Sequence, residues 1–119
     1  MTAVECLNEA RAAGERYQHP INEFIDSFRR AVGVERSRLV ADPISEMGTL
    51  EGLVAAVVSA LCRELGELTP IWVGEIASPV PFFAFPARSY ALRVRLMVES
   101  PPAFFIRNVF VPANYLSRA

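Results

Sequence analysis

One stretch of the chain, residues 48–66, constrains the fold more than any other because its pattern is that of a buried amphipathic helix. Seven large aliphatic residues recur there at steps of three and four, which places them on one helix face. They are Leu50, Leu53, Val54, Val57, Val58, Leu61 and Leu65. Thr49 is predicted to cap the first turn, and Gly66 to end the helix in the left-handed conformation. Small residues fill most of the remaining positions, so we expect burial on more than one side.

Length and composition indicate one small globular domain. The 119 residues are sufficient for one self-supporting core, so we expect a single domain over residues 1–119. No run of 18 apolar residues is present, which predicts no membrane-spanning helix. The first 16 residues carry acids and lack the basic start of a signal peptide, so we expect a cytoplasmic protein. Cys6 and Cys62 are far apart and are predicted to be small buried thiols.

Two further helices are predicted before the central one. Thr2 and Glu5 fit a capping box for a helix over residues 3–16. A second helix over residues 19–32 places four large apolar side chains and Val32 on one face. The polar connector over residues 34–47 has room for one helical turn near residues 37–40. The predicted fold class is therefore mainly α, with helices packed around residues 49–65, and α+β is the alternative.

The composition changes after the central helix. Residues 69–86 contain four prolines, which exclude a regular helix or a central strand. The same segment contains four aromatic residues, which a water-exposed loop does not normally carry. They are Trp72, Phe82, Phe83 and Phe85. Two interpretations stay open: a strap that packs across the helical core, or a set of aromatic anchors for a partner.

Residues 88–99 are the most ambiguous segment. Apolar residues occupy every second position there, which favours a half-buried strand; they are Leu92, Val94, Leu96 and Val98. The same segment would also fit an amphipathic helix. After it, Ser100 is predicted to cap a short helix over residues 101–107 that buries Phe104 and Phe105. Asn108 can close this helix in the left-handed region. Residues 109–111 are an apolar run that Pro112 ends. The expected helical fold has room for a short β pair near the C-terminus.

Charge is distributed unevenly along the chain. All 12 basic residues are arginine, and the net charge is −1. Residues 1–75 hold 12 acids and 7 arginines, a balance of −5, whereas residues 76–119 hold 1 acid and 5 arginines, a balance of +4. This polarity can orient a charged partner or pair the two halves of the chain. A sequence pI near 5.8 does not favour nucleic acid as the main partner.

Three segments near the C-terminus carry a recognisable pattern: Glu99-Ser-Pro-Pro-Ala-Phe104, Arg107-Asn-Val-Phe-Val111 and Leu116-Ser-Arg-Ala119. Together with looser similarity at residues 22–28 and 69–72, they resemble a family of small uncharacterised proteins of actinobacteria and other GC-rich bacteria. Proteins of this kind are similar to proteins encoded beside toxin genes. The resemblance therefore implies an antitoxin-like or regulatory role, with a toxin from a neighbouring gene as the partner.

Residue types that perform chemistry do not gather in this sequence. The single histidine, His19, stands at a helix start, and the six glycines are scattered rather than grouped as in a phosphate-binding loop. No spacing of His, Cys, Asp and Glu predicts a metal site. We therefore predict a non-enzymatic protein with no catalytic residue, no cofactor and no metal ion.

The leading hypothesis is a protein-binding module that covers a partner, or a second copy, with its aromatic and arginine-bearing C-terminal half. The candidate partner-binding residues are Trp72, Phe82, Phe83, Phe85, Arg93, Arg95, Phe105 and Arg107. One alternative is a transcriptional regulator that binds DNA through helices near residues 20–32 and 35–42. Another alternative is a small-molecule-binding or enzymatic domain built on the aromatic strap.

Overall fold

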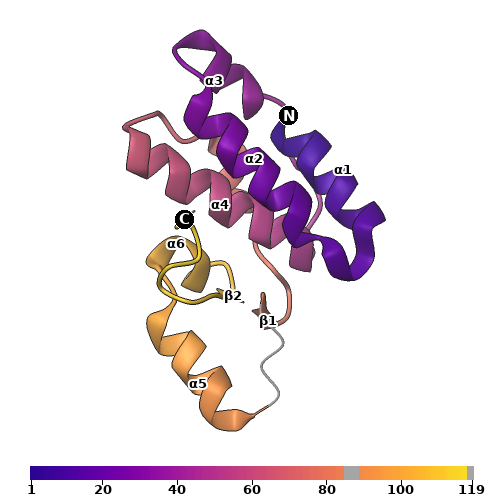
Figure 1. Cartoon of the computed structure of the whole chain (residues 1–119), viewed down its shortest axis with the longest axis vertical. Helices are drawn as coiled ribbons and strands as arrows, with labels where there is room; N and C mark the ends of the chain where they lie inside the picture. Colours follow the sequence, from indigo (N-terminus) through magenta and orange to yellow (C-terminus); the bar gives the residue numbers. More distant parts are fainter. Residues whose placement is uncertain (85–88, 118–119) are drawn as a thin grey trace.

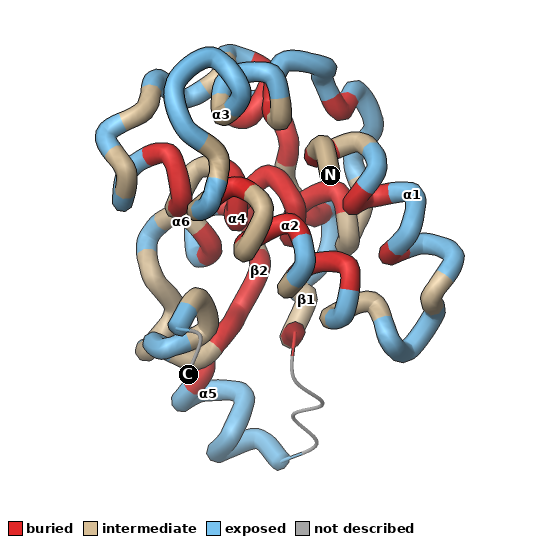
Figure 2. Tube along the Cα trace, turned by 45° about the horizontal axis from the view of Figure 1, so that its top comes forward, coloured by how far each residue is buried: buried red, intermediate tan, exposed pale blue. Residues whose placement is uncertain are grey.

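Helix α4, Thr49–Leu65, runs through the middle of the molecule, and the other elements are arranged around it (Figure 1). The computed structural model describes residues 1–84 and 89–117 and is mainly helical, as the sequence predicts. The buried residues of α4 form a continuous run from Glu51 to Val58, followed by Leu61 and Cys62, and Figure 2 shows this helix as mostly buried. Each large aliphatic side chain buried there stabilises the fold by about 1.5–3 kcal/mol.

Of the two predicted caps of α4, only the one at its C-terminal end is present. Gly66 closes the helix with φ 69°, in the left-handed region that favours glycine. At the other end the prediction is wrong, because Gly48 is the N-cap and Thr49 already belongs to the first turn without a side-chain capping bond. The Glu51 carboxylate lies close to Gly48, so a β-carbon at position 48 would require the Glu51 side chain to shift.

Helices α1, Ala3–Ala13, and α2, Gln18–Arg30, pack against each other and against α4. The capping box of α1 forms as predicted: the Thr2 hydroxyl accepts the Glu5 amide at 3.1 Å, and the Glu5 carboxylate accepts the Thr2 amide at 3.0 Å. A 3₁₀ turn, η1 (Gly14–Arg16), leads from α1 into α2, and the short helix α3, Val34–Leu39, follows α2. Arg29 of α2 pairs with Glu64 of α4 through two bonds of 3.0 and 2.8 Å.

The proline-rich segment forms a strap across α4. It begins with the 3₁₀ helix η2, Ile71–Glu75, in which Trp72 and Val73 are buried, and continues through the buried Ile76 and Ser78. The Trp72 indole N–H donates to the Val40 carbonyl at 2.9 Å. This first part of the segment therefore belongs to the core, in agreement with the strap interpretation.

A small parallel sheet joins the strap to the C-terminal part of the chain. Strand β1, Phe82–Phe83, pairs with β2, Val109–Phe110, so that Phe82 is opposite Val109 and Phe83 is opposite Phe110. Helix α6, Pro102–Phe105, precedes β2 and packs against α4 with the buried Phe104. Asn108 adopts φ 63°, as predicted. The predicted β pair is therefore present.

The preference for a strand over residues 88–99 is wrong, because Tyr90–Glu99 form helix α5. The Ser89 hydroxyl caps α5 by accepting the Leu92 amide at 3.1 Å. Strand β1 pairs with β2 and not with residues 90–99. A helix lets the backbone N–H and C=O groups of this segment bond to one another, so it needs no neighbouring strand. Ser100 is the C-cap of α5 rather than the N-cap of the next helix, which Pro101 precedes.

Gly52→Ala is expected to destabilise the protein by about 1–3 kcal/mol, because overpacking forces the backbone to shift. A β-carbon at residue 52 would meet the Ser78 amide nitrogen at 2.6 Å and the Ala77 carbonyl carbon at 3.0 Å. Gly74→Ala is the matched control, since nothing lies within 4 Å of a β-carbon there. Urea unfolding of both variants checks this, and equal stabilities would contradict the tight crossing of α4 and the strap.

Both cysteines are buried as predicted and are expected to be unreactive toward a maleimide in the folded protein. The Cys6 thiol donates to the Pro20 carbonyl over 3.6 Å, and burial raises its pKa to about 12. Because the thiolate is the reactive species, alkylation at pH 8 requires unfolding. Mass spectrometry should find no adduct in buffer and two adducts in denaturant. Rapid labelling in buffer would contradict the packing of this core.

Candidate functional site

Helix α5 projects from the helical body and exposes apolar side chains that do not contribute to the core. Tyr90 is 83% exposed, Val98 80%, Met97 41% and Val94 40%. These four residues, which we call the α5 stripe, are spaced three and four positions apart along one face of the helix. Figure 2 shows α5 as largely exposed, in contrast to α2 and α4. The stripe is therefore an apolar surface directed to solvent.

The opposite face of α5 fixes the helix to the rest of the protein. Leu96 is the one buried residue of α5, and it packs with Phe110 of β2 and the half-buried Phe83 of β1. The rings of Phe83 and Phe110 are 5.1 Å apart, and Phe105 of α6 contacts Phe110 edge-on at 5.9 Å. Phe83, Phe105 and Phe110, which we call the aromatic base, form one group of rings, and Leu96 of α5 packs on Phe83 and Phe110.

Ser100 ties the end of α5 to β2. Its hydroxyl lies 2.6 Å from the Leu96 carbonyl and accepts the Val111 amide at 2.8 Å. The next residues, Pro101 and Pro102, cannot extend α5. This junction sets the direction of α5 relative to the sheet.

Two arginines of α5 stand beside the stripe. The Arg93 guanidinium lies over the Phe83 ring at 5.5 Å, a cation–π contact. Arg95 is 75% exposed and bonds the Glu99 carboxylate at 2.6 Å. This guanidinium, followed by the Ala113 amide, lowers the pKa of Glu99. The acid is therefore ionised and turned toward residues 112–114, away from the stripe.

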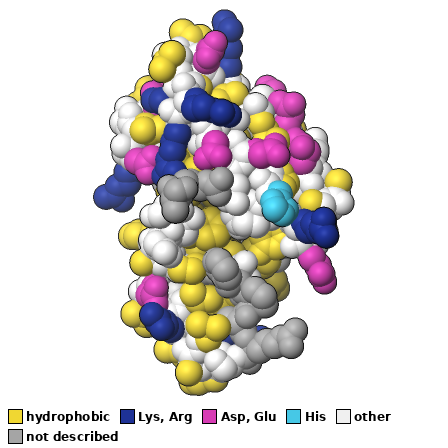
Figure 3. All heavy atoms as spheres, viewed as in Figure 1, with side chains coloured by type: hydrophobic (Ala, Val, Ile, Leu, Met, Phe, Trp, Pro, Cys, Tyr) yellow, Lys and Arg dark blue, Asp and Glu magenta, His cyan; other side chains and the backbone are white. Residues whose placement is uncertain are grey.

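Exposed apolar residues also occur on and beside α6. The prediction that Phe105 is buried is wrong, because it is 52% exposed, and Ile106 is 70% exposed. Figure 3 shows hydrophobic side chains gathered over the end of the molecule where α5 and β1 lie, while most acidic side chains lie over the helical body. Patches of this kind on a folded protein commonly mark interaction surfaces.

The candidate residues named from the sequence divide into two groups. Phe83, Arg93, Arg95 and Phe105 lie together on α5 and its aromatic base. Trp72 and Arg107 instead belong to the interior. Phe82 is half-buried against Tyr17, with ring centroids 5.9 Å apart. Phe85 lies outside the described residues.

Arg107 is a structural residue rather than a surface contact. It is 7% exposed and donates to the Val73 carbonyl at 3.2 and 3.4 Å and to the Ala103 carbonyl at 2.8 Å. Burial lowers the pKa of its guanidinium. Arg107 therefore connects α6 to the strap, because its guanidinium donates to a carbonyl group of each.

Sequence reasoning missed the α5 stripe and Ile106. A strand over residues 88–99 would have pointed Val94 and Val98 to the same side as Leu96, and hence into the core. The signal that could have found the stripe is Ser89, a favourable N-cap, followed by apolar residues at steps of three and four.

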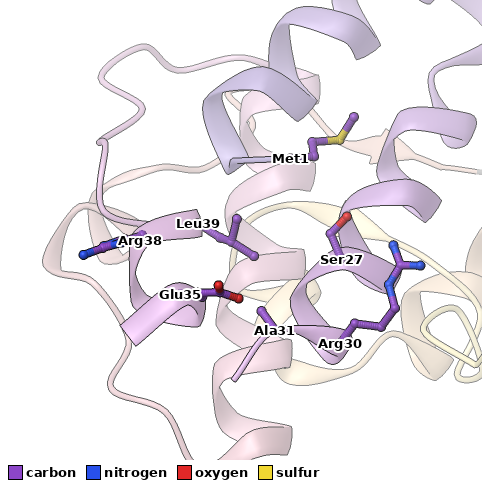
Figure 4. Close-up of a pocket in the computed structure, with 7 residues that line it drawn as sticks. All are labelled: Met1, Ser27, Arg30, Ala31, Glu35, Arg38 and Leu39. Atoms are coloured by element: carbon purple, nitrogen blue, oxygen red, sulfur yellow. The ribbon is translucent and has the colours of Figure 1, made fainter. Parts of the chain in front are cut away.

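One pocket lies between α2 and α3, at the other end of the protein from α5. Its volume is about 410 Å³, and Met1, Ser27, Arg30, Glu35 and Arg38 are among its lining residues. Arg30 and Arg38 extend to opposite sides of it (Figure 4). Polar groups thus do not converge on one point, as a small-molecule site requires.

The same two helices are the ones on which the DNA-binding alternative depends. Arg29 is engaged with Glu64, and Arg36 is engaged with Glu67 and the Phe28 carbonyl. These contacts hold α2 and α3 to the body and reduce the cationic surface that remains for a phosphate backbone.

Over residues 1–84 and 89–117, no three His, Cys, Asp or Glu side chains gather as a metal ion would need. In the same residues no helix has the length and apolarity to cross a membrane.

Comparisons with protein-family models, with curated proteins and with solved structures give no match to this chain. The assignment of a function therefore depends on the residues and their geometry.

Arg107→Gln is expected to destabilise the fold by about 2–4 kcal/mol, because it leaves buried carbonyl groups without their charged donor. Arg95→Gln removes an arginine from α5 that is 75% exposed and should leave the free energy of unfolding nearly unchanged. Urea unfolding of the two variants measures the difference. Equal effects would contradict the division of these arginines into a structural and a surface residue.

Proposed function

We propose that this protein is a non-enzymatic, antitoxin-like binding module that covers a partner protein with the α5 stripe and the neighbouring exposed side chains of α6. The observation that carries the proposal is the α5 stripe, because a helix with one buried residue otherwise exposes apolar surface to water at a cost.

The way α5 is mounted supports the same function. Its inner face is fixed by Leu96, the aromatic base and Ser100, so the stripe is presented by a helix with a defined direction. An apolar face held in place before binding loses less conformational entropy when a partner covers it. A partner that lies across α5 would bury Val94 and Val98 at the centre of the contact.

The antitoxin-like character of the proposal is supported by the resemblance of residues 99–104, 107–111 and 116–119 to proteins encoded beside toxin genes. The first two of these segments build the junction between α5, α6 and β2. The resembling residues therefore hold the proposed surface in place rather than form it, and the partner's identity depends on side chains outside them.

The test is co-expression with the protein encoded by the neighbouring open reading frame, followed by affinity capture and mass determination of the complex. Val94→Gln/Val98→Gln should weaken the complex about tenfold or more, since buried contacts of this kind are often worth over 1 kcal/mol each. Glutamine keeps a good helix propensity, so α5 should remain folded.

Val32→Gln/Val34→Gln is the matched control, because these valines are 71% and 67% exposed on the far side of the helical body. This variant should bind as tightly as the unchanged protein. Absence of any complex would refute the antitoxin-like proposal. Equal losses in both variants would show that the contact does not use α5.

A further inference from the structure

We infer that α5 opens and closes as a local unit held by Leu96, so that the affinity of the α5 stripe for a partner depends on a buried residue that the partner does not touch. Opening here means that α5 leaves the sheet and loses its helical structure while the rest of the protein stays folded. The role of the stripe rests on the proposed function, but the opening of α5 is measurable in the free chain.

The apolar contact beneath α5 is separate from the main core. Leu96 is 4% exposed and packs with Phe110 and the half-buried Phe83. Val109 and Val111, on either side of Phe110, belong instead to the main core around α4. Opening of α5 therefore disrupts a small cluster and leaves the main core intact.

Hydrogen bonds hold α5 at its C-terminal end. The Ser100 hydroxyl accepts the Val111 amide at 2.8 Å, and the Glu99 carboxylate accepts the Ala113 amide at 3.4 Å. Residues 90–95, by contrast, are all exposed (Figure 2). Leu96 thus lies between a bonded end and an exposed end of the helix, where its burial keeps α5 against the sheet.

The Arg93 side chain adds a weaker contact to the one that Leu96 makes. Its guanidinium lies over the Phe83 ring at 5.5 Å, and Arg93 is exposed. A cation–π contact at an exposed site stabilises a fold less than the burial of a leucine side chain does. Of these two contacts, Leu96 therefore contributes more to keeping α5 closed.

The helical structure of α5 depends on its contact with the sheet. The helix has 10 residues, which is fewer than the about 12–15 residues that an isolated helix needs in water. Val94 and Val98 are β-branched and lower its helix propensity, although the Ser89 cap favours its start. When α5 leaves the sheet, it is therefore expected to lose its helical structure in the same cooperative step.

This step determines whether the stripe exists as a surface. Tyr90, Val94, Met97 and Val98 share one face only while α5 is helical. A partner that covers the stripe binds the closed state, and its apparent affinity falls in proportion to the fraction of molecules in which α5 is closed. Leu96 faces the sheet, so it is a positioning residue for a contact that it does not make.

The test is amide hydrogen exchange in the full chain, followed by NMR, in two variants with the same substitution. Leu96→Ala should speed the exchange of amides 94–99 about tenfold or more and leave the α4 amides unchanged. Leu53→Ala, in the main core, should speed the exchange of α4 amides and leave amides 94–99 unchanged, because α5 opens without global unfolding. Leu96→Met keeps the size of the buried side chain and should exchange like the unchanged protein. If Leu53→Ala does not fold, the smaller change Val57→Ala takes its place.

Two results in the free chain would overturn the inference. One is exchange of amides 94–99 in step with the α4 amides in both variants, which would make α5 part of the global fold. The other is a lack of protection of amides 94–99 in the unchanged protein, which would show that Leu96 does not hold α5 closed.

The complex with the neighbouring gene product tests the effect on the stripe. Leu96→Asp places a charge in the apolar cluster and should open α5 in most molecules. In each Leu96 variant, the affinity should fall by the same factor as the closed fraction that the exchange rates give. Unchanged affinity in Leu96→Asp with α5 open would overturn the inference, and so would a loss of affinity larger than the loss of the closed fraction. If no complex forms at all, the proposed function fails, while exchange in the free chain still decides whether α5 opens alone.

Discussion

The close contact between α4 and the strap is the constraint on which the rest of the structure depends. At Gly52 the backbone of residues 77 and 78 comes so near to α4 that no β-carbon fits between them. The Ser78 amide donates to the Arg107 carbonyl at 2.9 Å, so the strap is bonded to the link between α6 and β2. The position of β1, β2 and α6 therefore follows from how closely the strap crosses the central helix.

The core is complete without α5. The large side chains of the core come from α1, α2, α4, the strap and α6. The C-terminal tail is bonded to α2, because Arg29 donates to the Leu116 carbonyl at 2.8 Å. Helix α5 adds only Leu96 to a small separate cluster with Phe110 and Phe83. Its exposed apolar residues are thus not explained by the stability of the fold, which is the physical reason for the proposal that they bind a partner.

The arginines show how the same residue type takes two roles. Arg107 lies inside the protein, where it offers several donors to the carbonyls of Val73 and Ala103. Arg93 and Arg95 lie on α5, where Arg93 contacts the Phe83 ring and Arg95 bonds the Glu99 carboxylate. A planar guanidinium with fixed donor directions suits both tasks, and burial separates them.

Sequence by itself determined the helical body. The spacing of aliphatic residues defined α4, the capping box defined the start of α1, and the prolines of residues 69–86 indicated a strap, because each of these signals acts over a few neighbouring residues. Only the tertiary structure decided which of Trp72, Arg107, Phe83 and Phe105 reach the surface. It also decided that residues 90–99 form a helix, since an alternating apolar pattern becomes a strand only where a neighbouring strand can pair with it. Burial and pairing depend on residues distant in the chain, so local spacing could not reveal the surface that α5 presents.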